Sequence, residues 1–398
     1  MQLFHLHYTL RRLLRSDLRR FDFAIWTHTF GQSLVSIFVP IFLLRLGYSI
    51  ESVIWFFIIY NAIDVPLNLV ARWMVWRIGA IRTIMVGLVF EVLFFVLLFS
   101  LGSGNWPLLI IIAAAAAAFD VCYWVAHIYF FMRVSPNNDN VSGDTSMLEI
   151  MRSVAGILAP AIGAMLFIFI GQRTLIAVSA VIISASILPL LSIRHTSDRP
   201  AHRPKTIRVF FTSLHDARAQ IVRALFSVHG AAEGVIWPLF IYMTFTTIES
   251  VALVPIIVSL TTIVFMYIAG RMEHRWRTAS VVIGAASIAV VWGLRLVVDN
   301  TIFYYVSIFL VGFFAVLVTI PTDSCLFEEG ERKDALTAST YRNLFGMLMR
   351  LVFFVVLAIL TDVFHVSFLT AAMSLLALVA VVVCIRAPSI VSRPRTGH

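Results

Sequence analysis

Residues 40–53 read PIFLLRLGYSIESV, and residues 238–251 read PLFIYMTFTTIESV. The opening proline, the phenylalanine two residues after it and the closing Ile-Glu-Ser-Val recur at one constant offset of 198 residues (position 50 to position 248). The same offset relates further pairs, namely Arg20 and Arg218, Arg77 and Arg275, and Met151-Arg152 and Met349-Arg350. Chance identity between two Leu-, Val- and Phe-rich halves explains a shared phenylalanine, but it explains a repeated tetrad and paired arginines poorly. The chain is therefore predicted to be an internal duplication.

The composition identifies the environment of both copies. Of 398 residues, 60% are hydrophobic and only 13% are charged, whereas soluble domains are about half apolar and about a quarter charged. A soluble enzyme, a disulfide scaffold and a disordered chain are thus excluded. Stretches of about 20 apolar residues, enough to cross a bilayer, occur at roughly 22–46, 50–74, 82–101, 106–132, 147–170, 173–193, 218–246, 249–270, 279–297, 301–326, 335–361 and 363–386. We predict an all-α integral membrane protein with twelve transmembrane helices.

The two copies are predicted to have the same orientation in the membrane. Each contains six spans, and an even number returns the chain to its starting side, so the repeats are parallel and related by an axis along the membrane normal. The predicted division of the chain is an amphipathic segment 1–21, a six-helix bundle 22–194, a linker 195–217, a second six-helix bundle 218–386 and a tail 387–398.

The net charge of +9 is explained by its placement. Lys and Arg are concentrated before the first span, in the central linker and in alternate loops, while the opposite loops carry few, with Arg173 and Arg295 as the main exceptions. This positive-inside pattern predicts cytoplasmic termini in a plasma (inner) membrane, and nucleic-acid binding becomes an unnecessary explanation. The three cysteines lack paired spacing and no phosphate-binding loop occurs, so we expect no metal, no cofactor and no ATP-driven motor.

The duplicated chain resembles the major facilitator superfamily over almost its full length. The loop signature of that family corresponds here to Arg72–Arg82, which keeps Arg77, Gly79 and Arg82 but lacks the opening glycine and the acid. The second copy keeps Gly270 and Arg275, with His274 in the place of the acid. The resemblance implies that these loops form a cytoplasmic gate, although the missing acids put its usual charge contacts in doubt. It also implies a secondary transporter without enzymatic activity that works by alternating access.

A second, weaker resemblance lies in the fifth span. Gly156-Ile-Leu-Ala-Pro160-Ala-Ile-Gly163 is similar to a glycine- and proline-containing motif associated with antiporters. Small residues allow close helix contact, and proline removes a backbone hydrogen bond. The motif favours export, and ordinary helix packing is the alternative.

Ionisable side chains at membrane depth are candidates for function, because they are costly against lipid. The resemblance implies that spans 1, 4, 7 and 10 line the central cavity. Span 4 presents Asp120, Tyr123, Trp124 and His127 at one-turn spacing. Span 7 presents His229, Glu233 and Trp237, span 1 presents His28 and Gln32, and span 2 presents Asn61 and Asp64 near Pro66. We predict that Asp120 and Glu233 carry protons and that the other residues line the substrate cavity, with structural hydrogen bonding as the alternative for each.

The repeat-related Arg152 and Arg350 need a carboxylate, an anionic substrate or a route to the interface. They are predicted to bind an anionic group or to pair with the acids. Glu91 and Arg295, on spans 3 and 9, are interpreted as structural or interfacial.

These features predict proton-coupled export of an amphiphilic or anionic compound. The expected partners are a small solute, protons and the lipid bilayer, with the protein acting as a monomer. A proton-independent uniporter or importer of a sugar or organic anion is one alternative, and a transport-inactive assembly factor or sensor is another.

Overall fold

The computed structural model describes residues 17–134, 141–193, 199–200, 202, 214–269, 276–330, 334–360 and 362–385. Every element in these ranges is a helix. The first half contains α2 (Asp17–Val35), the 3₁₀ turn η1 (Ser36–Phe38), α3 (Val39–Arg45), α4 (Ile50–Ile78), α5 (Ala80–Phe99), α6 (Trp106–Val134), α7 (Val141–Phe169) and α8 (Gln172–Leu191). The second half contains α10 (Leu214–Ala231), the π-helical turn η3 (Ala232–Ile236), α11 (Trp237–Phe245), α12 (Ile248–Ala269), α13 (Arg277–Val297), α14 (Thr301–Glu329), α15 (Ala335–Ile359) and α16 (Val363–Cys384).

The protein is a multi-pass membrane protein. Within the described ranges, 11 helices are long and apolar enough to cross a membrane, with α2 to α3 and α10 to α11 each acting as one span. The predicted fifth span corresponds to α7, in which the apolar stretch Val154–Phe169 is shorter. The all-α prediction is confirmed, whereas the count of twelve spans stays a prediction.

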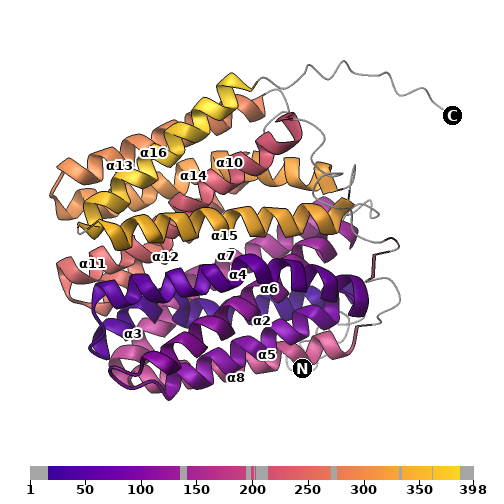
Figure 1. The fold of residues 1–398 in the computed structure, drawn as a ribbon, viewed down its shortest axis with the longest axis horizontal. Coiled ribbons are helices and arrows are strands. Elements are labelled where there is room, and N and C mark those ends of the chain that lie inside the picture. The colour runs from indigo at the N-terminus through magenta and orange to yellow at the C-terminus, as the bar shows by residue number, and fades with distance from the viewer. Residues whose placement is uncertain are drawn as a thin grey trace, which may run out of the picture.

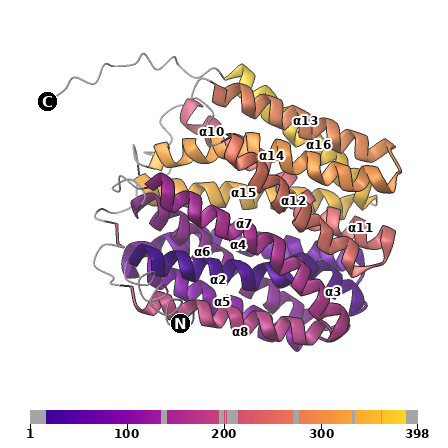
Figure 2. The same ribbon diagram turned by 180° about the vertical axis from the view of Figure 1, so that it is seen from behind.

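The helices of the two halves form two groups that lie side by side (Figure 1). The view from behind shows the same separation (Figure 2). Across the boundary α4 and α6 pack against α15, and α7 packs along α12. We call the end where α3 and α11 lie, at the left of Figure 1, the α3/α11 end. The opposite end, where α8 ends and α10 begins, is called the linker end. The exact bundle boundaries stay a prediction.

The first helix of each half is interrupted at the repeated proline. Pro40 follows the 3₁₀ turn η1, and Pro238 follows the π-helical turn η3. Proline has no N–H to donate to the preceding turn, so it is tolerated where a helix restarts. The two interruptions differ in winding, because η3 accommodates more residues per turn than η1.

Gly79, one of the three retained residues of the loop signature, is required by the backbone conformation. It is the single residue between α4 and α5, with φ of +96°, and its N–H donates to Val75 O at 3.1 Å. Side-chain-bearing residues rarely adopt this conformation. The glycine is thus required by the tight turn, whereas the exposed Arg77 and Arg82 on either side are not.

Two glycines of the predicted antiporter motif lie at close helix contacts. A Cβ on Gly163 would overlap the backbone carbonyl of Leu34 on α2, whereas one on Gly156 would meet the side-chain hydroxyl of Ser259 on α12. Gly163 therefore sets the spacing of two helices within the first half, and Gly156 lies at the boundary between the halves.

Replacing Gly163 with alanine is expected to destabilise the protein more than replacing Gly156 with alanine. A backbone carbonyl cannot move away without shifting α2, and such overpacking costs about 1–3 kcal/mol, whereas the Ser259 side chain can rotate. Thermal unfolding of the two purified variants in detergent would measure the difference. Equal midpoints would show that α2 and α7 can separate freely.

Candidate functional site

A cavity of about 290 Å³ lies between the two halves. Its walls come from α2, α4, α5 and α6 of the first half and from α10, η3 and α15 of the second. Seven of the 20 lining residues are aromatic: Phe56, Phe57, Tyr60, Phe94, Phe95, Phe119 and Phe354. The polar ones are Gln32, Ser36, Asn61, Glu91, Asp120 and Arg350. The cavity is therefore an aromatic chamber with a few charged groups.

Packing between the halves closes the space on the linker side of this cavity. The apolar side chains there come from α6, α14 and α15 and comprise Ile128, Met132, Leu326, Ala338 and Tyr341. Arg72 on α4 donates from Nη2 to Thr337 Oγ1 on α15 at 2.9 Å. This contact region, which we call the linker-side gate, separates the cavity from the linker end.

Asp120 reaches the cavity together with a second acid. Asp64 is 0% exposed and Asp120 is 7% exposed, and the two acids are near enough for their charges to interact. Asn68 Nδ2 donates to Asp64 Oδ1 at 2.8 Å. Among the described residues, the buried Asp64 Oδ2 has no donor. Asp64 was predicted from the sequence to line the cavity, but its position close to Asp120 was not foreseen.

Asn343 connects this acid pair to the second half. From α15 its Nδ2 donates to Asn68 Oδ1 at 3.1 Å and to Asp120 Oδ2 at 3.3 Å. The two asparagines and the two acids thus form a buried polar cluster across the boundary, which we call the acid cluster. Tyr60 is also near enough to Asp120 for the charge of the acid to act on it.

Arg350 lines the same cavity from α15, one turn from Met347. Its single polar contact within the described part of the chain is from Nη1 to Met347 Sδ at 3.8 Å, and its Nε is buried without a partner. Asp64 and Asp120 are near enough for their charges to interact with it, yet neither forms an ion pair with it.

Glu91 and His28 form a pair at the edge of the cavity. His28 Nε2 and Glu91 Oε2 lie 2.8 Å apart, and both side chains are buried. Glu91, interpreted from the sequence as structural or interfacial, also lines the cavity from α5. His28 itself is stacked against Tyr123, at 4.2 Å between ring centroids.

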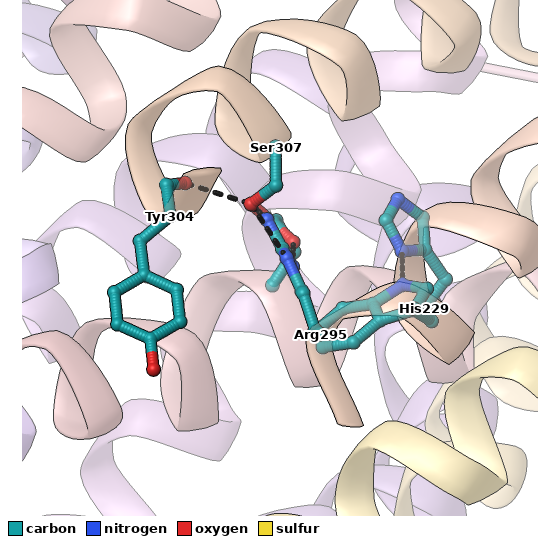
Figure 3. A network of polar contacts seen from close by, with 6 residues as sticks. His229, Arg295, Tyr304 and Ser307 are labelled. Carbon is teal, nitrogen blue, oxygen red and sulfur yellow. Dashed lines mark hydrogen bonds and ion pairs between the residues drawn. The ribbon is translucent and has the colours of Figure 1, made fainter. Parts of the chain in front are cut away.

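Glu233 is held inside the second half by Arg295. Arg295 Nη1 donates to Glu233 Oε2 at 2.6 Å, and the two side chains are 0% and 13% exposed. Arg295 Nε donates to Ser307 Oγ at 2.9 Å, and Ser307 in turn donates to the backbone oxygen of Tyr304 (Figure 3). Gly230, Ala231, Gly234 and Val235 line the cavity around Glu233, but Glu233 is not among the lining residues.

Two tryptophans enclose this ion pair. The guanidinium carbon of Arg295 lies 3.5 Å from the ring centroid of Trp237 and 4.4 Å from that of Trp292. Trp292 Nε1 donates to His229 Nδ1 at 2.9 Å. Arg295, interpreted from the sequence as structural or interfacial, is buried, and its pairing with Glu233 is what the structural alternative predicts.

The remaining predicted residues divide into three groups. Gln32 and Asn61 line the cavity, and Asn61 Nδ2 donates to Phe57 O at 2.6 Å. Tyr123, Trp124, His127, His229 and Trp237 are packed among other rings and are not lining residues. Gly270 and Arg275 lie outside the described residues, as does the side chain of Arg152.

Sequence spacing missed the cross-helix partners Tyr60, Asn343 and Arg295. A signal for the first existed, since Tyr60 precedes Asp64 by one turn on the same face of span 2. None of the described residues forms a cluster of three or more His, Cys, Asp or Glu side chains suited to a metal.

Comparisons with known proteins agree with this architecture. A protein-family model described as Major Facilitator Superfamily matches residues 21–353. No curated protein matches the chain. Among solved structures, the human organic anion transporter MFSD10 (TETRAN) is similar at 12% sequence identity and a TM-score of 0.67, over 92% of this chain and 100% of that chain. A POT family transporter in complex with 5-aminolevulinic acid is similar at 10% identity and a TM-score of 0.71, over 92% and 95%. At such low identities the structural likeness establishes the fold alone.

Proposed function

Because the chain belongs to the Major Facilitator Superfamily, which implies membrane transport of a solute, we propose that it is a proton-linked carrier of a small amphiphilic or anionic compound. Membership confirms the resemblance identified from the sequence. The observation that carries the proposal is the cavity between the halves, which is lined by Asp120 of the acid cluster from the first half and by Arg350 from the second. A solute there touches both halves, so it can influence how they move relative to one another.

The acid cluster is suited to binding and releasing a proton. Two neighbouring buried carboxylates repel each other when both are charged. A single proton between Asp64 and Asp120 removes the repulsion and supplies the donor that Asp64 Oδ2 lacks among the described residues. Asp120 lines the cavity, so a proton can reach the pair from there.

Asn343 provides a link between that proton and the linker-side gate. A charged carboxylate accepts a stronger hydrogen bond than a neutral one. The bond from Asn343 to Asp120 therefore holds α15 against α6 more firmly when the pair carries a negative charge. Full protonation weakens this bond and favours opening at the linker end. With the linker end cytoplasmic, as the arginine distribution predicts, the present state faces outward.

Two coupling modes follow from two observations. The glycines of α7 resemble an antiporter motif and favour proton exchange and export, although both glycines also lie at close packing contacts. The proximity of Arg350 to the acids favours co-transport of an anion with the proton. Glu233, the second proton candidate from the sequence, is paired with Arg295, so we assign proton coupling to the Asp64–Asp120 pair.

Cysteine accessibility tests alternating access without knowledge of the solute. In a background where Cys122, Cys325 and Cys384 are replaced by serine, Ser36→Cys reports on the cavity and Ala338→Cys on the linker-side gate. Lowering the pH of detergent-solubilised protein is expected to slow maleimide labelling at position 36 and to accelerate it at position 338. If labelling at positions 36 and 338 changes in opposite directions but does not depend on pH, a proton-independent uniporter would be favoured. Constant labelling at both positions would favour a transport-inactive protein.

A further inference from the structure

We propose that the solute is a compact organic monoanion with an aromatic or similarly apolar body, that its carboxylate binds Arg350, and that its binding is accompanied by proton uptake. This inference rests on the proposed carrier function and specifies the chemical class of solute and the sign of its coupling to the proton.

Arg350 is the charged group of the cavity that lacks a partner of opposite charge. Among the described residues its guanidinium contacts only a thioether sulfur, at 3.8 Å, which is a weak acceptor. Its Nε has no partner. An arginine keeps its charge under all ordinary conditions, and a charge at membrane depth is costly without a counter-ion. A carboxylate in the cavity would supply the missing acceptor with the two-pronged geometry that guanidinium prefers.

The lining acids do not create the opposite preference for a cation. Glu91 already has His28 at 2.8 Å. Asp120 accepts from Asn343 and lies within reach of Tyr60 and Asp64. A cationic solute would have to approach the unpaired guanidinium of Arg350 and would be repelled by it. When the nearby Asp64–Asp120 pair is protonated, the positive charge of Arg350 is left without a negative neighbour, and this selects an anion.

The residues that line the cavity indicate the size and the apolar character of the anion's body. Aromatic side chains come from both halves: Phe57 and Phe354 stack across the boundary with ring centroids 5.0 Å apart. A volume of about 290 Å³ lies at the lower limit of the roughly 300–1,000 Å³ of ligand pockets, so the body is compact. On the second-half side, Gly230 and Gly234 present backbone without side chains, and a Cβ at Gly230 would lie 3.8 Å from Arg350 Nη2. These glycines leave room beside the guanidinium.

Proton uptake follows from the charges around Arg350. The groups that face it are Asp64 and Tyr60 on α4 and Asp120 on α6, with the Glu91–His28 pair beyond them. A bound carboxylate next to a negatively charged Asp64–Asp120 pair would be repelled. Protonation of the pair removes this repulsion, so anion and proton favour each other's binding. A cation exchanged for a proton would instead release one.

Three aromatic probes of nearly equal shape test the inference: benzoate, benzyl alcohol and benzylamine. Their binding to the purified full-length protein in detergent is measured by calorimetry and by the rise in unfolding temperature. Benzoate is expected to bind, with proton uptake recorded by an indicator dye in weak buffer, and benzylamine is not. Arg350→Gln is expected to weaken benzoate binding by roughly 10- to 100-fold, because a charge-assisted hydrogen bond is lost. The affinity of Arg350→Lys for benzoate should lie between those of the unaltered protein and Arg350→Gln, because lysine keeps the positive charge but cannot form the two parallel hydrogen bonds of a guanidinium.

The matched control is Arg173→Gln, which removes an exposed arginine that lies over the Phe99 ring, away from the cavity. It should bind benzoate like the unaltered protein. Stabilisation by benzylamine, proton release on benzoate binding, or an unchanged affinity in Arg350→Gln and Arg350→Lys would each overturn the assignment. These failures are distinguishable from a failure of the carrier proposal, because the pH-dependent labelling of positions 36 and 338 needs no solute.

Discussion

Asparagine in place of Asp120 is expected to abolish proton-driven transport while leaving downhill exchange of solute intact. The substitution keeps the size of the side chain and can still accept a hydrogen bond from Asn343, but it removes the carboxyl group through which the cavity reaches the acid pair. In proteoliposomes, a pH gradient should then drive solute accumulation no better than it does in liposomes without protein. Counterflow at equal pH on both sides should continue, which separates lost coupling from lost folding.

Asp64→Asn and Glu249→Gln complete this experiment. Asp64 shares the proposed proton with Asp120 but does not line the cavity, so its replacement should impair coupling by altering the charge of the pair. Glu249 is an exposed acid in the first turn of α12, and Glu249→Gln should behave like the unaltered protein. If a pH gradient still drives solute accumulation by the Asp120→Asn variant, the acid cluster is not the site of coupling.

Properties that depend on one segment of the chain were predictable from the sequence. The length of the apolar stretches predicted the helices. The constant offset of the repeat identified the two matching prolines at which the first helix of each half restarts. Asp120 was identified because an acid on an inner span has few alternatives to a wet or paired environment. Each of these inferences uses only the spacing of residues along one helix.

Contacts between helices were not predictable, because they depend on how the helices pack. Each of the following pairs joins two different helices, so the spacing of residues along one helix cannot reveal it: His28 and Glu91, Glu233 and Arg295, and Asn343 and Asp120. The π-helical turn at Ala232–Ile236 adds a second difficulty. A wider turn changes the direction of every following side chain relative to a regular helix of 3.6 residues per turn. The one-turn ladder predicted for His229, Glu233 and Trp237 consequently does not project into the cavity as a unit.

The second large effect expected is on stability. Glu233→Gln should destabilise the second half by about 3–5 kcal/mol, because it leaves the fully buried guanidinium of Arg295 without its counter-charge. The two tryptophan faces around Arg295 do not offset this loss, because these cation–π contacts are already present in the unaltered protein. The unfolding midpoint of purified protein, followed by intrinsic fluorescence in detergent, measures the change.

Two comparisons give this result its meaning. The Arg277–Glu328 pair has the same 2.6 Å separation, but its side chains are 27% and 57% exposed, so Glu328→Gln should cost less than about 1 kcal/mol. Removing both buried charges with Glu233→Gln and Arg295→Met together should recover much of the lost stability, because no uncompensated charge then remains. If the single Glu233→Gln variant instead keeps its stability but loses proton coupling, Glu233 carries the proton after all, as its position in the seventh span first suggested.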